Sequence, residues 1–244
     1  MSVAPGSYFF MHIMKTAGTS FAQHLEANFP DDEIYPHPST KGPVHMEQYW
    51  KVAELRALTA EDRARIRVYA GHFPYVASRI VHADTTLTIL RHPVARTYSA
   101  LRHLERHFPQ HHGKALEAIY EDDWHHPTWL RNYQVKLFAL TLEDDPQAHI
   151  DVVEVDEARF RVAVGHLEEM ALFGLTERYD EFTAEVARRY GWSFGDAKRL
   201  QVGGEADDVP AALRRRIEED SAADVAFYEH ARSLVEARRT ATRS

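Results

Sequence analysis

Two short apolar segments, each followed by a polar turn and a helical pattern, constrain the fold of this chain more than any other feature. The first covers residues 8–13 (YFFMHI) and the second covers residues 85–90 (TTLTIL). Short runs of bulky and β-branched residues bounded by turn residues are typical of buried strands. Pro93 follows the second run and suits the first turn of a helix, where its missing amide hydrogen is not needed. The pattern predicts repeated strand–loop–helix units.

The rest of the chain continues this alternation of strands and helices. Residues 68–71 and 171–175 are predicted to be further short strands, and the proline-rich segment 30–50 is predicted to be a loop. Apolar spacing predicts helices over residues 20–28, 52–67, 94–106, 130–142, 156–170, 182–190, 210–219 and 222–238. Such an order predicts an α/β fold with three layers around a central, mostly parallel sheet, in which ligands bind at the carboxyl ends of the strands.

The composition restricts the class of protein. A chain of 244 residues with 44% hydrophobic residues can bury one sizeable core, so we expect a single domain over residues 1–244. The sequence contains no cysteine, which excludes disulfides and suits a reducing compartment. No segment resembles a signal peptide or a membrane span, so we expect a cytoplasmic protein. The net charge of -8 argues against binding to nucleic acid, and any anion must therefore be bound locally.

A candidate anion site lies between the first predicted strand and the helix that follows it. It comprises Lys15, Thr16, Ala17, Gly18, Thr19 and Ser20. In a turn of this kind, backbone amides and the positive end of the helix dipole point at one place. Glycine allows close approach of the backbone, hydroxyl groups add donors, and lysine adds a mobile positive charge. An ordinary capped turn also fits this local pattern.

A second candidate anion site follows the strand at residues 85–90. Arg91 ends that strand, and Ser99 lies about two helical turns further along. Arginine binds a phosphate through two parallel hydrogen bonds and keeps its charge. An arginine that only pairs with a surface carboxylate is the alternative. Two such sites on one sheet indicate a ligand with two separated phosphate groups.

Two longer strings around these sites resemble the sulfotransferases that use 3'-phosphoadenosine-5'-phosphosulfate (PAPS). They are HIMKTAGTSF at residues 12–21 and RHPVARTYSA at residues 91–100, and Met14 stands where many relatives have proline. Further similar segments are AGHF at 70–73, NYQ at 132–134, FGLTER at 173–178 and the stretch 224–231, so the resemblance covers about residues 8–232. The branch it indicates is the carbohydrate type that includes the uronyl 2-O-sulfotransferases.

The resemblance implies a P-loop-like nucleotide-binding sulfotransferase fold and a role for each segment. Lys15 to Ser20 would bind the 5'-phosphosulfate, and Arg91 and Ser99 would bind the 3'-phosphate. The enzyme would transfer a sulfuryl group from PAPS to a hydroxyl of a carbohydrate or of another glycosylated or hydroxylated molecule, releasing adenosine 3',5'-bisphosphate (PAP). Lys15 would stabilise the departing phosphate, and His72 would act as general base. A purely structural role for His72 is the alternative.

Two other functions remain open from the sequence. A kinase of small metabolites or nucleotides would share the strand–loop–helix start and would depend on magnesium. The triphosphate-binding pattern G-x-x-x-x-G-K-[ST] is absent, because Gly113–Lys114 lacks the upstream glycine. A nucleotide-binding module without activity is the other alternative, which the presence of Lys15 and His72 disfavours.

The chain is rich in histidine between its predicted core helices. His103, His107, His111 and His112 have nearly helical spacing, and His125 and His126 follow. This spacing is compatible with a metal site, but we expect a solvated polar face and no metal. Solvated positions are likewise expected for Glu117, Glu121, Asp122 and Asp123. Residues 30–49 and 103–129 are expected to shape the pocket for the acceptor.

Overall fold

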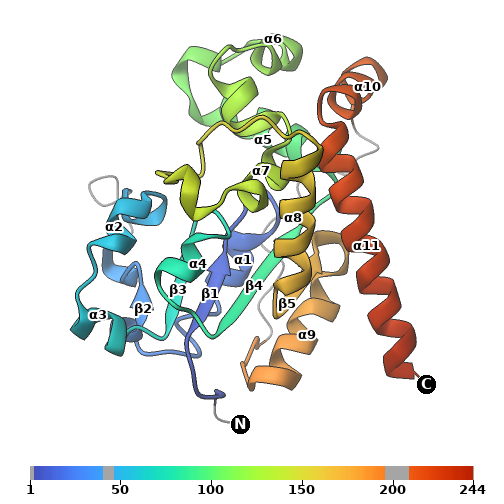
Figure 1. Cartoon of the computed structure of the whole chain (residues 1–244). Coiled ribbons are helices and arrows are strands. Elements are labelled where there is room, and N and C mark those ends of the chain that lie inside the picture. Colours follow the sequence, from blue (N-terminus) through green and yellow to red (C-terminus); the bar gives the residue numbers. More distant parts are fainter. Residues whose placement is uncertain (1–2, 41–46, 196–208, 244) are drawn as a thin grey trace.

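Five parallel strands form one sheet in the order β2-β3-β1-β4-β5 in the computed structural model, which describes residues 3–40, 47–195 and 209–243 (Figure 1). The strands are β1 (Tyr8–Met11), β2 (Ile34–Tyr35), β3 (Val68–Gly71), β4 (Thr85–Leu90) and β5 (Leu172–Leu175). Met11 pairs with both Gly71 and Thr88, so β1, β3 and β4 end at the same edge. The predicted α/β fold with a parallel sheet is confirmed, and β2 is a strand that was predicted to be loop.

The central strand β1 shows why the sheet is covered on both faces. Its four residues are all buried, and successive side chains of a strand point to opposite faces. Tyr8 and Phe10 pack with α1 (Gly18–Ala22) and α9 (Tyr179–Tyr190). Phe9 and Met11 pack on the other side with α7 (Tyr133–Ala139), α8 (Glu157–Glu169) and α11 (Ala222–Arg243). Three layers result, as predicted.

Three helices differ from the sequence prediction, and the one predicted over residues 130–142 is the shorter α7. The helix predicted over residues 52–67 is two helices, α2 (Val52–Arg56) and α3 (Ala60–Arg65). Thr59 caps α3, because its hydroxyl accepts the amide of Asp62 while the Asp62 carboxylate accepts the amide of Thr59. The helix predicted over residues 20–28 is the five-residue α1, and turns continue the chain to Phe29.

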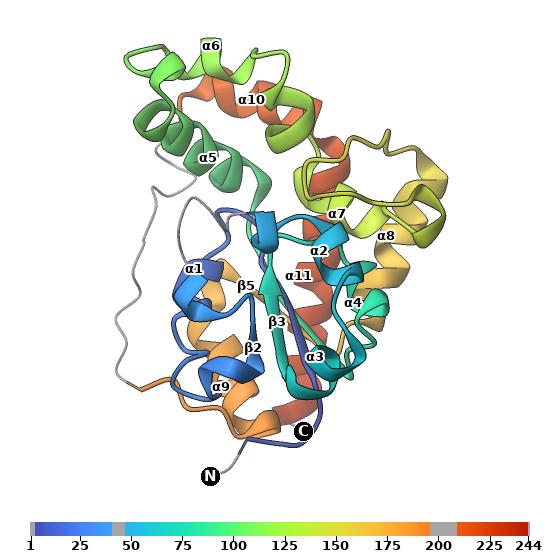
Figure 2. The same ribbon diagram turned by 90° about the vertical axis from the view of Figure 1, so that its left-hand side faces the viewer.

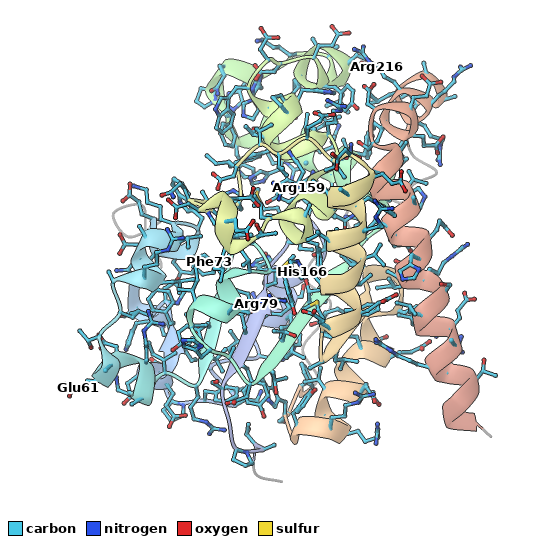
Figure 3. All side chains as sticks on the ribbon, viewed as in Figure 1. Glu61, Phe73, Arg79, Arg159, His166 and Arg216 are labelled. Atoms are coloured by element: carbon cyan, nitrogen blue, oxygen red, sulfur yellow. The ribbon has the colours of Figure 1, made fainter. Side chains whose placement is uncertain are left out.

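A group of helices lies beyond the carboxyl ends of the strands and is here called the helical cap. It consists of α5 (Pro93–His107), α6 (Leu116–Tyr120), a π-helical turn (His126–Leu130) and α10 (Ala211–Asp220). Both ribbon views place α5, α6 and α10 together above the sheet (Figures 1 and 2). They share an apolar cluster that includes Leu104, Ile119 and Ile217. Arg216 of α10 also forms an ion pair with Glu121, which follows α6 (Figure 3).

The segment 132–134 ties α7 to α11 by reciprocal capping. Asp224 is buried and accepts the backbone amides of Gln134 and Val135 at 3.2 and 2.6 Å. In return, the side-chain oxygen of Asn132 accepts the amide of Asp224 at 3.0 Å. This arrangement fixes the start of α7 next to the carboxyl end of β4, where the candidate site begins.

The remaining short helix, α4 (Ala77–Ile80), follows β3 on the same face as α2. None of the helices in the described residues has the length and apolar character needed to cross a membrane.

Candidate active site

A pocket of about 360 Å³ lies at the carboxyl ends of the strands, and it unites the two segments that the sequence singled out. Eight of the predicted site residues line it: Lys15, Ala17, Gly18, Thr19, Ser20, His72, Arg91 and Ser99. His12, Met14, Gln23, His103 and Thr176 complete the lining. The first segment follows β1, His72 follows β3, Arg91 follows β4 and Thr176 follows β5. The topology of the sheet therefore brings these distant residues together.

The loop after β1 has a strained backbone. Lys15 and Ala17 both have left-handed φ angles, 70° and 71°, which side chains other than glycine adopt at a cost. Ala17 precedes α1 without any side-chain cap, so the first amides of this helix receive no capping acceptor from that side chain. A five-residue helix carries only a small part of a full macrodipole. Most of the positive charge at this loop must therefore come from side chains.

Gly18 is required by the close approach of His12. A Cβ atom at position 18 would lie 2.0 Å from His12 Cδ2 and 2.4 Å from His12 Nε2. Such distances are far shorter than a van der Waals contact. Gly18 therefore lets the His12 ring pack directly on the backbone at the start of α1. The sequence predicted glycine at position 18 to allow close approach of an anion. The contact with His12 is a second reason for glycine there, and it is visible only in the structure.

Thr16 is the one residue of the predicted loop whose side chain does not reach the pocket. It is buried, and its hydroxyl donates to the carbonyl of Ile13 at 2.9 Å. Its own carbonyl lies 3.1 Å from the hydroxyl of Thr176, which is also 3.1 Å from the carbonyl of Leu90. These contacts connect the loops that follow β1, β4 and β5. The Thr16 hydroxyl thus holds the loop in shape.

Two arginines hold consecutive carbonyls of the loop. Arg91 Nη1 donates to the carbonyl of Lys15 at 3.1 Å, and Arg96 Nε donates to the carbonyl of Met14 at 3.1 Å. Arg96 is 0% exposed, and its guanidinium group lies 3.9 Å from the centre of the Tyr133 ring. Burial lowers the pKa of Arg96 to about 10, which leaves it charged at neutral pH. Arg96 is a supporting residue that the sequence reasoning did not single out.

Gln134 fixes the point at which Arg91 leaves β4. Its side-chain oxygen accepts the amide of Arg91 at 3.0 Å, and its side-chain nitrogen donates to the carbonyl of Arg91 at 2.7 Å. Gln134 is buried, so both bonds are shielded from water. The capping contacts between α7 and α11 hold Gln134 itself. The segment 132–134 therefore sets the position and the backbone direction of Arg91.

Lys15 lies in a strongly positive environment. Burial lowers the pKa of its ammonium group, and the guanidinium groups of Arg96 and Arg91 lower it further. Burial also lowers the pKa of His103 to about 4, and Lys15 is the next largest cause. A site with several cations and a neutral histidine favours an anionic ligand, which would offset the repulsion between them.

His72 has a defined tautomer. Its Nδ1 lies 2.6 Å from the carbonyl of His12, and because a carbonyl can only accept, Nδ1 carries the proton. In the neutral ring, Nε2 is then the basic nitrogen. Burial lowers the pKa of His72, so the neutral form dominates at pH 7. The residue can therefore take a proton at Nε2 without first losing one.

Two more histidines extend this group. The ring of His12 lies 4.4 Å from that of His72, and the ring of His149 lies 5.5 Å from that of His72. Burial is the main cause that holds the pKa of both well below the ordinary value. Trp50 and Trp129 lie 5.8 and 6.2 Å from the His149 ring. Two tryptophan side chains thus lie next to His149, whose ring is a neighbour of the His72 ring.

The other histidines of the cap region differ from one another. His107 and His112 are exposed, as expected, and His103 lines the pocket. The expectation of a solvated face is wrong for His111 and His125, which are 1% and 4% exposed. Their rings lie 4.8 Å apart, and the ring of His125 also contacts those of Phe108 and Trp129. Among the acidic residues, Glu117, Glu121 and Asp123 are exposed as expected, whereas Asp122 is half-buried beside His125.

Comparison with known proteins gives weak similarity to two sulfotransferases of known structure. The first is a sulfotransferase from Alicyclobacillus acidocaldarius, with 14% identity, a TM-score of 0.47, and coverage of 93% of this chain and 95% of that one. The second is mouse sulfotransferase SULT7A1 complexed with PAP, with 14% identity, a TM-score of 0.41, and coverage of 91% and 66%. No family model and no curated protein matches the chain. At these values the similarity assigns no function, which must be inferred from the site itself.

Proposed function

We propose that this protein is a PAPS-dependent sulfotransferase that acts on a hydroxyl group. The observation that carries the proposal is that the loop after β1, Arg91 and Ser99, and His72 all line the same pocket. Two anion-binding segments and one neutral histidine within one pocket suit a donor with two phosphate groups and an acceptor that must lose a proton. A kinase would normally carry the triphosphate loop that this sequence lacks.

The donor would be held from two sides. Lys15 and the backbone between Ala17 and Ser20 would bind the 5'-phosphosulfate. Arg91 and Ser99 would bind the 3'-phosphate, and the bonds from Gln134 would keep Arg91 in place. Arg91 also donates to the Lys15 carbonyl, so the two halves of the donor site are mechanically joined. This coupling supports one ligand that spans both segments.

The chemical step would be an in-line transfer with a loose transition state. The acceptor oxygen would form a bond to sulfur while the bond between sulfur and the bridging oxygen of the donor breaks. His72 Nε2 would take the proton of the acceptor hydroxyl, and His12 would hold the ring through its carbonyl. Lys15 would stabilise the negative charge that develops on the leaving phosphate. The products would be a sulfate ester and PAP.

A carbohydrate or another glycosylated or hydroxylated molecule is our proposed acceptor class. The half-buried Trp50 and Trp129 next to His149 support it, because the flat faces of tryptophan pack well against the C–H faces of sugar rings. The ring of His149 lies 5.5 Å from that of His72 and so connects the two tryptophans to the proposed base. The sequence resemblance to the uronyl 2-O-sulfotransferases points the same way.

Transfer of labelled sulfate tests the proposal. The protein is incubated with PAPS carrying ³⁵S, with a panel of glycosides and phenols, and without magnesium. We expect a labelled ester from at least one acceptor, and we expect Lys15→Met to lose at least about 100-fold of the rate. Lys114→Met, at an exposed position, is the matched control and should keep the rate.

Two outcomes would contradict the proposal. One is transfer of phosphate from ATP that requires magnesium and is lost in Lys15→Met, which would establish the kinase alternative. The other is equal transfer of sulfate by the wild type and by Lys15→Met, which would show that the pocket is not the reacting site.

A further inference from the structure

Three potential metal ligands converge inside the helical cap, away from the pocket described above. They are His111, at the end of the turn after α5, Asp122, after α6, and His125, at the start of the π-helical turn. One ligand atom from each lies within 4.8 Å of those from the other two. Both imidazoles are more than nine-tenths buried. We propose that these residues bind a divalent late transition metal ion, with zinc as the best fit.

The distances suit a tetrahedral zinc site before the ion is bound. Zinc bonds to nitrogen and carboxylate oxygen are about 2.0–2.2 Å, so neighbouring ligand atoms in a tetrahedron are about 3.3–3.5 Å apart. His111 Nε2 and His125 Nδ1 are 3.3 Å apart. The carboxylate oxygens of Asp122 lie 2.8 Å from His125 Nδ1 and 4.0 Å from His111 Nε2. Binding of the ion would need the carboxylate oxygen nearest to His125 Nδ1 to move away by roughly half an ångström.

Hydrogen bonding alone leaves this cluster poorly satisfied. His125 Nδ1 has one proton or one lone pair, yet it faces both the Asp122 carboxylate and His111 Nε2. The outer nitrogens, His111 Nδ1 and His125 Nε2, are buried without a hydrogen-bond partner. All polar contacts of the two rings thus point toward one centre. A single cation between the three groups would satisfy the two inner nitrogens and the carboxylate at once, and the outer nitrogens would then carry the ring protons.

The carboxylate is also held in place for this role. Asp122 Oδ1 accepts the backbone amides of Trp124 and His125 at 3.1 and 2.9 Å. Contacts of this kind orient a ligand from outside the coordination sphere. Asp122 is half-buried, so solvent can reach its side of the cluster and supply a water as the fourth ligand. Imidazole and carboxylate together favour zinc and its neighbours over magnesium or calcium.

The ion would join parts of the cap that have little regular structure. The three ligands come from the two connections on either side of α6, His111 from the one before it and Asp122 and His125 from the one after it. The ring of His125 lies 5.7 Å from that of Trp129, which in turn lies 6.2 Å from that of His149. A metal here would therefore help to hold Trp129 next to His149. Binding of the metal itself does not depend on the proposed enzymatic activity.

The test is a zinc titration of the full chain after treatment with a chelator. We expect one tight equivalent by calorimetry, and a visible absorption band of tetrahedral type when Co²⁺ replaces zinc. At about a hundredfold excess of free zinc over Kd, Tm should rise by about 5–10 °C. Asp122→Asn should weaken binding by more than about 100-fold, because loss of an outer contact alone typically costs 10–100-fold.

Asp122→Asn is the decisive variant because its side-chain oxygen can still accept the amides of Trp124 and His125, which preserves the fold. His125→Gln should lose the tight equivalent as well. His107→Gln and His112→Gln, both at exposed positions, control for weak binding by surface histidines and should keep it. The proposal is overturned if the wild type has no tight equivalent, or if Asp122→Asn and His125→Gln both retain it.

Discussion

Substitution of Gly18 by alanine is expected to destabilise the protein because the new side chain would collide with His12. Replacement of His12 by alanine should abolish this effect. The new Cβ would lie 2.0, 2.4 and 2.8 Å from three atoms of the His12 ring. This ring cannot move freely, because it lies 5.9 Å from the ring of Phe10 and 4.4 Å from that of His72. Insertion of a methyl group into such a contact typically costs about 1–3 kcal/mol.

A second effect acts in the opposite direction. Gly18 does not have a left-handed φ, and alanine within a helix is favoured over glycine by roughly 0.5–1 kcal/mol. The net loss should therefore be about 1–2 kcal/mol, which corresponds to a fall in Tm of roughly 2–8 °C for a chain of this size. In the His12→Ala background the collision is absent, so the same substitution should raise the stability by roughly 0.5–1 kcal/mol.

Thermal or urea unfolding of four proteins measures this change of sign: the wild type, Gly18→Ala, His12→Ala and the double variant. The coupling energy between the two positions should be about 2 kcal/mol. An effect of Gly18→Ala that is the same in both backgrounds would refute the reasoning, because it would mean that His12 does not require glycine at position 18.

Three further outcomes are expected. His72→Ala should lower turnover by about 10²-fold or more with unchanged PAP binding, and because burial lowers the pKa of His72, the acid limb of the wild-type rate profile should lie below pH 6.5. Gln134→Leu should weaken PAP binding and cost about 2 kcal/mol of stability, since it leaves the backbone of Arg91 unpaired. Asp144→Asn should cost about 2 kcal/mol at pH 7, because the bond from Arg159 lowers the pKa of Asp144 from 3.8 to about 2. As the folded-state pKa is depressed, this contribution is complete above about pH 4 and declines as the pH falls toward 2.

Each of these outcomes has a control and a result that would contradict it. His107→Ala should leave turnover unchanged, and an acid limb above pH 7 would remove His72 as the neutral base. Loss of stability without loss of PAP affinity in Gln134→Leu would mean that Gln134 does not position Arg91. Glu157→Gln breaks an exposed pair with Arg161 and should cost less than about 0.5 kcal/mol. If Asp144→Asn costs as little, the pair of Asp144 with Arg159, which is labelled in Figure 3, stabilises the protein no more than an exposed pair does.

The central strands could be predicted because their sequence is unambiguous. Residues 8–13 and 85–90 are short apolar runs beside turn residues, and both are buried on two faces of the sheet. β2 was missed because it has only two residues and lies among prolines. The break between α2 and α3 depends on the capping contacts of Thr59, which interrupt an otherwise continuous helical pattern. Local hydrogen bonds of this kind compete with apolar periodicity and are easily overlooked.

The candidate site could be predicted where it follows the strands and not where it depends on long-range packing. The loop after β1 and Arg91 were identified because each comes directly after an apolar run. Thr176 has the same position after β5 but lacks a charge that would draw attention to it. Arg96, His103 and His149 reach their places only through the packing of the cap and of the segment around residue 149 on the sheet. Periodicity along the chain contains no information about such contacts.

Calorimetric titration with PAP, without magnesium, tests the proposed donor site most directly. PAP should bind more tightly than ADP, which lacks the 3'-phosphate. Arg91→Ala should weaken PAP binding by roughly 10–100-fold, as expected for loss of a charge-assisted phosphate contact. Arg102→Ala, at an exposed position on α5, should bind PAP like the wild type. Equal or tighter binding of ADP, or PAP affinity that does not change in Arg91→Ala, would contradict the proposal that this pocket holds PAPS.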